Sequence, residues 1–303
     1  MMAIPTVQQT DLKGLELKVR GKVRDIYDTG EHLLIVATDR ISAFDHILQS
    51  PVPNKGAVLT QISLFWFNLL KDVTPNHLVT ADVDEMPEAV KKHADVLRGR
   101  SMLCLKATPF DAECIVRGYL VGSGWKDYQR TGQVCGIDLP TGMAKGDPIS
   151  PAIFTPSTKA QVGLHDENVD WDGFAKAVGE KWATPMKQRT LDAFAACSEH
   201  AASCGITLCD TKLEWGLVDG ALTLIDEAFT PDSSRFWKTD EKNATPKGED
   251  PPSFDKQVVR DWLETSGWDK TSAPPAVPEE ILEVAAGRYL EIYELLTGKP
   301  LSV

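Results

Sequence analysis

The chain has 303 residues, 42% of them hydrophobic and 25% charged, which is the composition of one large folded domain or of two modest ones. Its formal net charge of −12 argues against nonspecific binding to nucleic acid or to an anionic membrane, but it permits a local basic pocket for an anionic small molecule. The 6 cysteines form no C-x-x-C pair and no apolar run reaches membrane-spanning length, so we expect reduced thiols and a cytoplasmic protein.

The first predicted elements are strands joined by a Gly-Lys turn, within residues 15–37. Gly21, Lys22 and Arg24 lie at this turn, where backbone amides and two cations can fold over a polyphosphate. An exposed hairpin turn without a ligand explains the same residues, and GxxxxGK[ST] is absent from the chain. Both interpretations of the turn remain open.

A charged segment, TDRISAFDHIL, follows the strand predicted at 33–37. Loops at strand ends are held by a rigid scaffold and are often functional, which makes Ser42 and Asp45 candidates for a binding site. The alternative is a helix cap, in which Asp39 or Ser42 accepts from backbone N–H groups. Residues 59–70 then predict a buried apolar helix, and residues 101–107 predict another strand.

An arginine and a glycine-rich turn mark the next candidate site. Arg117 ends a strand predicted at 113–117, and a guanidinium binds phosphate or carboxylate through two hydrogen bonds. Gly122 and Gly124 let the backbone approach an anion closely, and Ser123 adds a hydroxyl group. A structural ion pair between Arg117 and Glu113 is the competing interpretation.

Residues 137–156 are rich in proline and glycine and predict a long surface loop. The loop leads into STKAQVGLHDEN, where Lys159 is a candidate phosphate ligand. Helices are predicted at 171–178 and 184–204, followed by a hairpin over residues 208–229. Two more helices are predicted at 254–265 and 279–297, the first with Lys256 and Arg260 one turn apart.

The turn of the 208–229 hairpin decides which carboxylates meet. A two-residue Asp219-Gly220 turn places Glu227 on the face of Glu214 and Asp226 on the opposite face. A three-residue turn with a bulge makes Asp226 the diagonal neighbour of Glu214 instead, opposite Lys212. In that register two carboxylates are able to share a hard cation. A solvated strand face with incidental ion pairs is the alternative.

Several segments, taken together and in order, resemble the SAICAR synthetase family. They are GKVRDIYD (21–28), TDRISAFD (38–45), ECIVRGYLVGS (113–123), FTPSTKA with GLHDEN (154–168), CDTKLEWG (209–216) and DEAFTPDSSRFW (226–237). The length and the C-terminal helices resemble the longer form found in yeast and some bacteria.

The resemblance implies an α+β fold with two lobes, antiparallel sheets, flanking helices and a cleft like that of kinases or ATP-grasp enzymes. We expect an N-terminal lobe over residues 1–108, with the phosphate-covering hairpin, and a larger C-terminal lobe over residues 109–303. The implied reaction joins L-aspartate to the carboxylate of 5-amino-1-(5-phosphoribosyl)imidazole-4-carboxylate, giving SAICAR, ADP and phosphate in de novo purine biosynthesis. It requires ATP and Mg²⁺ and passes through an acyl phosphate. The partners are these small molecules, without nucleic acid or membrane, and we expect a monomer.

The resemblance also implies roles for individual residues. ATP is contacted by Gly21, Lys22 and Arg24 at its phosphates and by Lys106 and Phe110 at its adenine, with Glu113 also on the nucleotide side. The metal ligands are Glu214 and Asp226. The substrates are bound by Ser42, Arg117, Ser123, Asp232 and Arg235. Catalysis falls to Lys212, Asp45 and Lys159. Tyr119 stands where the short bacterial form has a second arginine, so the resemblance does not carry that arginine's contact over to this chain.

Two further expectations follow. The bulged register of the hairpin is favoured, because only it brings Glu214 and Asp226 to one face. Without the resemblance, the residues fit either a Mg-ATP-dependent ligase or kinase that acts on an anionic metabolite, or a non-catalytic nucleotide-binding regulatory module. Release of ADP distinguishes the enzyme from the module.

Overall fold

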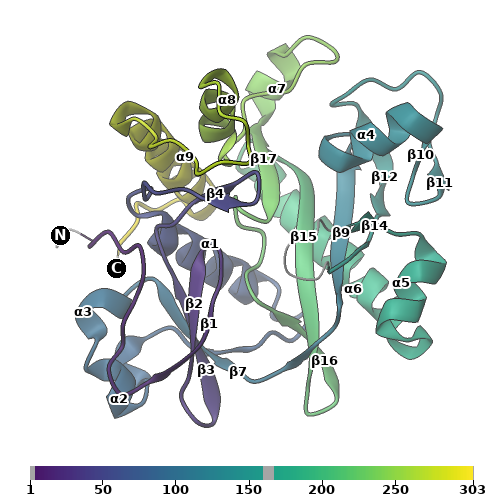
Figure 1. Cartoon of the computed structure of the whole chain (residues 1–303). Helices are drawn as coiled ribbons and strands as arrows, with labels where there is room; N and C mark the ends of the chain where they lie inside the picture. Colours follow the sequence, from purple (N-terminus) through teal and green to yellow (C-terminus); the bar gives the residue numbers. More distant parts are fainter. Residues whose placement is uncertain (1–3, 160–166, 303) are drawn as a thin grey trace.

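Two antiparallel sheets organise the chain, which a computed structural model describes over residues 4–159 and 167–302. The first sheet has 5 strands in the order β1-β2-β3-β7-β6. Its strands are β1 (Glu16–Arg20), β2 (Arg24–Asp28), β3 (His32–Ala37), β7 (Ser101–Leu105) and β6 (Leu78–Thr80). In Figure 1 this sheet lies at the lower left, in purple and blue.

Helices cover both faces of the first sheet because its side chains alternate in direction. Leu34 and Val36 of β3 belong to a small core with the short helices η1 (Val83–Glu85), α2 (Glu88–Lys91) and α3 (Ala94–Leu97). Ile35 points the other way, into the main core, where α1 (Lys55–Leu69) packs. The strands and the buried helix predicted for this region are therefore confirmed, with α1 beginning at Lys55.

The second sheet has 8 strands and is built around β15 (Ile206–Val218). β9 (Ala112–Tyr119), β8 (Thr108–Pro109), β16 (Ala221–Ile225) and β17 (Ser234–Lys238) all pair with β15. β12 (Pro148–Phe154), β13 (Ser157–Thr158) and β14 (Glu167–Asn168) extend the sheet beyond β9. The helices α5 (Trp171–Val178) and α6 (Glu180–Ser203) follow in the chain, and α6 packs against β15 and β9.

The remaining elements surround the two sheets. They are the hairpins β4 (Ser42–Ala43) with β5 (His46–Ile47) and β10 (Gln133–Val134) with β11 (Ile137–Asp138), and the helices α4 (Gly122–Thr131), α7 (Thr239–Ala244), α8 (Gln257–Thr265) and α9 (Glu279–Thr297). α9 packs on both α1 and α8 (Figure 1). One continuous core joins Ile35, Trp215 and Tyr289. The predicted division between residues 108 and 109 stays a prediction.

The α+β class with antiparallel sheets and flanking helices is confirmed, but the long surface loop predicted at 137–156 is wrong. Within it, β12 pairs with β9, with an irregular register between Pro148 and Ile153. Prolines cannot donate to a strand ladder and are tolerated at sheet edges and irregularities. The proline content therefore hid an irregular strand that lies over the end of β9.

Candidate active site

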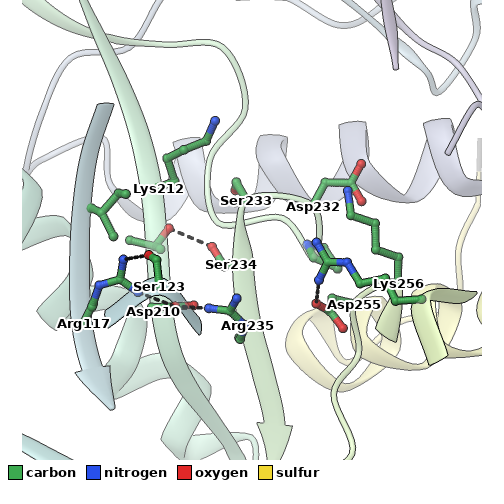
Figure 2. Close-up of a pocket in the computed structure, with 14 residues that line it drawn as sticks. Arg117, Ser123, Asp210, Lys212, Asp232, Ser233, Ser234, Arg235, Asp255 and Lys256 are labelled. Carbon is green, nitrogen blue, oxygen red and sulfur yellow. Dashed lines mark hydrogen bonds and ion pairs between the residues drawn. The ribbon is translucent and has the colours of Figure 1, made fainter. Parts of the chain in front are cut away.

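Strand β15 brings residues from distant parts of the chain together. Its register sets Asp210 opposite both Arg117 on β9 and Arg235 on β17. The Asp210 carboxylate forms an ion pair with Arg235 and lies 3.5 Å from the Arg117 guanidinium. Figure 2 shows these three side chains gathered on one side of the pocket. A buried carboxylate thus holds two arginines side by side.

The two arginines form the anion-binding end of the pocket. Arg117 is 2% exposed and donates to the hydroxyls of Ser123, at 2.8 Å, and Thr155, at 3.0 Å. Burial lowers the pKa of Arg117, while Asp210 raises that of Arg235. Both guanidinium groups stay charged, since arginine does not lose its proton in proteins. One carboxylate between two cations leaves a net positive charge for an anionic ligand.

Glycines allow α4 to begin against these arginines. Gly122 has a φ of +56°, and a Cβ on it would lie 2.8 Å from Nη2 of Arg235. A Cβ on Gly124 would lie 3.1 Å from Cδ of Arg117. No side chain caps the N-terminus of α4, so its first backbone N–H groups remain available to an anion. The sequence predicted that these glycines let the backbone approach an anion closely. In the structure they let the start of α4 pack against Arg235 and Arg117.

Lys212 lies at the centre of the cleft and is a cation. Its ammonium forms an ion pair with Glu113, whose other oxygen accepts from Ser157 at 3.2 Å. Burial opposes the charge on Lys212, but Glu113 and the neighbouring Glu214 outweigh burial and raise the pKa of Lys212. Lys212 therefore remains protonated at neutral pH, where it is able to stabilise negative charge but not to act as a base.

The predicted metal ligands lie among cations. Arg24 forms ion pairs with the carboxylates of Asp226 and Glu227. Lys159 lies 2.6 Å from Glu214. Burial disfavours the charged form of Glu214, but Lys159 outweighs it and lowers the pKa of Glu214, so this carboxylate is ionised. Within residues 4–159 and 167–302, no group of three or more acidic, histidine or cysteine side chains is arranged to hold a metal.

The predicted register of the hairpin is wrong. Val218 pairs with Ala221, and Glu214 pairs with Ile225, so the turn has two residues, Asp219 and Gly220, both with positive φ. Such a turn follows the twist of the strands and needs no bulge. The return strand is also shorter than expected, ending at Ile225. Glu214 and Asp226 thus do not approach through strand alternation; Asp226 lies beyond the ladder, with a φ of 66°.

A central cleft joins these groups. We use this name for a cavity of about 700 Å³ that continues into a smaller one of about 210 Å³, since six residues line both: Ser123, Lys212, Asp232, Arg235, Lys256 and Arg260. Lys22, Arg24, Ser42, Phe44 and Asp45 line the larger cavity from the N-terminal part of the chain. Asp45 lies at the tip of the β4–β5 hairpin, 2.6 Å from Lys22. Nine residues predicted from separate segments thus meet in the central cleft.

Other predicted residues lie away from the cleft. Lys106 contacts Asp28 at 2.8 Å on the first sheet, and Phe110 packs against Trp182 with ring centroids 6.1 Å apart. Neither lines the central cleft. Gly21 closes the turn between β1 and β2, accepting through its carbonyl from Arg40. Their predicted contacts with ATP stay predictions.

Several residues of the site were not among the predicted ones. Asp210 is the shared partner of the arginines, and His77 donates to the backbone carbonyl of Asp226 at 3.1 Å. Burial lowers the pKa of His77 to about 4, which keeps the ring neutral. The ammonium group of Lys256 has no hydrogen bond or ion pair with any residue in the described part of the chain, although Lys256 lines the cleft. The spacing of Lys256 and Arg260, one turn apart on a predicted helix, was the sequence feature that could have indicated a cationic side of the cleft.

The match to a known family decides the identity of this site. A sequence model described as SAICAR synthetase matches residues 17–275. The chain belongs to the SAICAR synthetase family. The phosphoribosylaminoimidazole-succinocarboxamide synthase of Syntrophobacter fumaroxidans is 54% identical over 292 residues, covering 96% of each chain. That of Geotalea uraniireducens is 52% identical over 293 residues, covering 97% of this chain and 98% of the relative.

Solved structures of SAICAR synthetases share the fold. The Saccharomyces cerevisiae SAICAR synthase complexed with SAICAR is 38% identical, with a TM-score of 0.87, and the match covers 98% of this chain and 100% of that one. A type-2 SAICAR synthetase in complex with ADP matches with a TM-score of 0.69 at 23% identity, covering 94% and 99% of the two chains. The resemblance to the longer, yeast-like form is confirmed. None of the helices described at 4–159 and 167–302 has the length and apolar character needed to cross a membrane.

Proposed function

We propose that the central cleft joins L-aspartate to the carboxylate of 5-amino-1-(5-phosphoribosyl)imidazole-4-carboxylate, hereafter the ribonucleotide. The chain is an ATP-dependent ligase with the SAICAR synthase activity of its family, in de novo purine biosynthesis. One observation supports the location of the reaction. Lys22 and Arg24, which are expected at the nucleotide, and Arg235, which is expected at the substrate, line a single cavity of about 700 Å³.

The ribonucleotide phosphate has a fitting partner at the anion-binding end. Arg117, Arg235 and the hydroxyl of Ser123 surround the N-terminus of α4. Guanidinium groups and helix N-termini both bind phosphate well. Asp232 lines the same cavity and is able to accept a hydrogen bond from a hydroxyl or amino group of the same substrate.

The phosphates of ATP fit the opposite end. Lys22 and Arg24 line the cleft there, on a turn that Arg40 holds from behind by donating to the Lys22 and Gly21 carbonyls. Mg²⁺ suits the carboxylates of Glu214 and Asp226, because it needs only one or two protein carboxylates besides phosphate and water oxygens. When bound it would neutralise charge on the phosphates. The adenine is assigned to the region of Lys106 and Phe110 by resemblance alone.

The ligation takes two steps, and in each of them one bond forms and one breaks. An oxygen of the imidazole carboxylate attacks the γ-phosphorus of ATP, the bond to the β–γ bridging oxygen breaks, and ADP and an acyl phosphate result. The aspartate amine then attacks the acyl carbon, the bond to phosphate breaks, and the nitrogen loses a proton. Lys212 and Lys159 are cations placed to offset negative charge on the transferring phosphoryl group.

L-Aspartate is assigned to the space between the β4–β5 hairpin and α8. Its two carboxylates need cations that neither ATP nor the ribonucleotide phosphate uses. Lys256 and Arg260 line this side of the cleft, and Ser42 and Asp45 line the other. In Figure 2, Lys256 lies across the pocket from Arg117.

A coupled assay for ADP release tests the proposal. We expect release to require ATP, the ribonucleotide and L-aspartate together, with SAICAR formed in equal amount. ADP release that does not need aspartate would indicate a small-molecule kinase instead. Binding of ATP without release of ADP under any combination would indicate a nucleotide-binding module and refute the ligase.

A further inference from the structure

A buried lysine lies below the central cleft. Lys55, at the start of α1, has a side chain that is 0% exposed, and its ammonium lies 2.6 Å from Oδ2 of Asp232. Lysine is almost never fully buried unless it is paired, because removing an ammonium ion from water is strongly unfavourable. Replacing such a pair with apolar residues is often harmless to stability. Stability alone therefore does not explain the Lys55–Asp232 pair, and we look for its role in the cleft that Asp232 lines.

A tyrosine from the C-terminal helix completes the arrangement. The hydroxyl of Tyr289 on α9 donates to Oδ1 of Asp232 at 2.8 Å, and the Tyr289 side chain is fully buried. The Lys55 ammonium also lies 5.7 Å from the centre of the Tyr289 ring. Each oxygen of Asp232 thus has its own donor, from a different helix. Two donors fix both the position and the rotation of a carboxylate.

Asp232 is also a residue of the cleft wall, with 5% of its side chain exposed. Asp232 lines both parts of the cavity, beside Lys256 and Arg260. Burial disfavours its charged form, but Lys55, Lys256 and the Tyr289 hydroxyl outweigh burial and hold the pKa of Asp232 well below its usual range. Asp232 is therefore an ionised acceptor held in place from behind.

α1 also holds the loop that carries Asp232. The Ser63 hydroxyl accepts from the Ala228 N–H at 3.4 Å, and the Trp66 indole donates to the Phe229 carbonyl at 3.0 Å. With Lys55, α1 contacts the loop at three points. The loop begins at Asp226, at the nucleotide end of the cleft, and leads into β17, which carries Arg235 at the anion-binding end. Its position sets the spacing between the two ends of the cleft.

We infer that Lys55 and Tyr289 are positioning residues for the ligation, which fix the Asp232 carboxylate from behind so that it accepts a hydrogen bond from the bound ribonucleotide. The inference rests on the proposed function, since it takes the ligand of Asp232 to be the ribonucleotide. α9 then contributes to substrate binding without reaching the substrate. Neither residue is a catalytic residue, because neither lines the cleft.

Tyr289→Phe tests this with little risk to the fold, since it removes only the hydroxyl. We expect the KM for the ribonucleotide to rise by about 5- to 10-fold, the effect of one hydrogen bond. The kcat and the KM for ATP should stay within about twofold. The matched control is Tyr293→Phe, one turn along α9, because the Tyr293 hydroxyl has no hydrogen bond within residues 4–159 and 167–302. The control should match the wild type in all three constants.

A double-mutant cycle asks whether Tyr289 acts through Asp232. In the Asp232→Asn background, Tyr289→Phe should change the KM for the ribonucleotide by less than about twofold. Additive effects, or equal effects of Tyr289→Phe and Tyr293→Phe, overturn the inference. Inactivity of the wild type with all three substrates overturns the proposed function instead, so the two failures are distinguishable.

Lys55→Met provides a pH signature that a purely structural role would not produce. The groups facing Asp232 are Lys55 from α1, Tyr289 from α9 and Lys256 from the start of α8, with Arg260, Asp255 and Glu227 acting on these partners. Without Lys55, burial raises the pKa of Asp232 with less opposition, and the protonated acid is a poorer acceptor. We expect kcat/KM for the ribonucleotide to fall by at least about tenfold more than the wild type between about pH 8 and pH 6. An unchanged profile in a folded variant contradicts the inference, and the Tyr289 cycle decides it if Lys55→Met does not fold.

Discussion

Asp226 has a backbone conformation that few residues other than glycine adopt, with a φ of 66°. Aspartate tolerates this region better than most residues, because its short polar side chain forms local hydrogen bonds. The conformation ends β16 and turns the side chain toward Arg24. His77 holds the backbone of Asp226 from the other side, through its carbonyl. Strain at this residue is thus balanced by two partners, Arg24 at the side chain and His77 at the backbone.

Replacing either proposed metal ligand should remove most of the activity. We expect Glu214→Gln and Asp226→Asn to lower kcat by at least about 100-fold at saturating Mg²⁺, because charge on the transferring phosphoryl group loses its main stabilisation. Steady-state kinetics over a range of Mg²⁺ concentrations measures the effect. Isothermal titration calorimetry with Mg-ADP measures nucleotide affinity as a second readout of metal binding.

Asp219→Asn is the matched control, since it removes a carboxylate at the tip of the same hairpin. Circular dichroism should show all three variants folded. Near-normal turnover in both Glu214→Gln and Asp226→Asn would mean that other groups hold the metal.

At the scale of residues, the sequence predicted the side chains that meet at the anion-binding end of the cleft, but it did not predict the carboxylate that pairs with the two arginines. Arg117, Ser123 and Arg235 meet at one end of the cleft as expected. The sequence around Asp210, which pairs with both arginines, does not indicate that this residue is buried. A carboxylate in a strand of alternating polar and apolar residues is expected to face solvent. Its burial depends on β9 and β17 pairing with β15 in one register, and a single strand does not specify that pairing.

Asp25 shows how a buried ion pair supports a whole element. Asp25 is 0% exposed, lies 2.8 Å from Nη2 of Arg40 and accepts from Thr10. Arg40 in turn donates to three backbone carbonyls of the turn between β1 and β2. The turn that we place over the ATP phosphates is therefore shaped from behind by one guanidinium group and its carboxylate.

Removing this carboxylate should weaken both stability and ATP binding. We expect Asp25→Asn to lower the free energy of unfolding by about 3–5 kcal/mol, because Arg40 is left buried without its counter-ion. Burial disfavours the charged form of Asp25, but Arg40 and Thr10 outweigh it and lower its pKa below the ordinary 3.8. The contribution of the ion pair is thus fully present above pH 3.8 and is lost as the pH falls through the lower folded-state pKa.

Urea denaturation at several pH values measures this prediction. The wild type should lose stability steeply below about pH 4, whereas Asp25→Asn should lose less over the same interval. Asp11→Asn is a control on an exposed carboxylate in the same N-terminal region. Parallel pH curves for the wild type and Asp25→Asn would contradict the assignment.

Elements were predicted better than their connections. The helices α5 and α9 have the expected bounds, because apolar residues at helical spacing and capping signals give their ends. The register of the β15–β16 hairpin was wrong because two turns of different length are both compatible with Asp219-Gly220. The strand β12 was missed because its prolines are typical of loops. Its pairing with β9 is a tertiary contact, which the local sequence does not indicate.

The whole molecule places the site where the two sheets and the C-terminal helices meet. α9 packs on α1 from the N-terminal part of the chain, and Tyr289 and Lys55 contact the same carboxylate. Neither contact follows from sequence, because the contacting residues are 177 and 57 positions apart and give no local pattern.

A continuous core predicts that the chain unfolds as one unit. The core cluster joins Ile35, Trp66, Trp215 and Tyr289, and so spans both predicted lobes. We expect one peak in differential scanning calorimetry, with calorimetric and van't Hoff enthalpies that agree. Leu296→Ala should move the entire peak to lower temperature, because Leu296 on α9 is 1% exposed and its removal leaves a cavity costing about 2–5 kcal/mol. Two peaks, of which Leu296→Ala moves only one, would show instead that residues 1–108 and 109–303 fold as separate lobes.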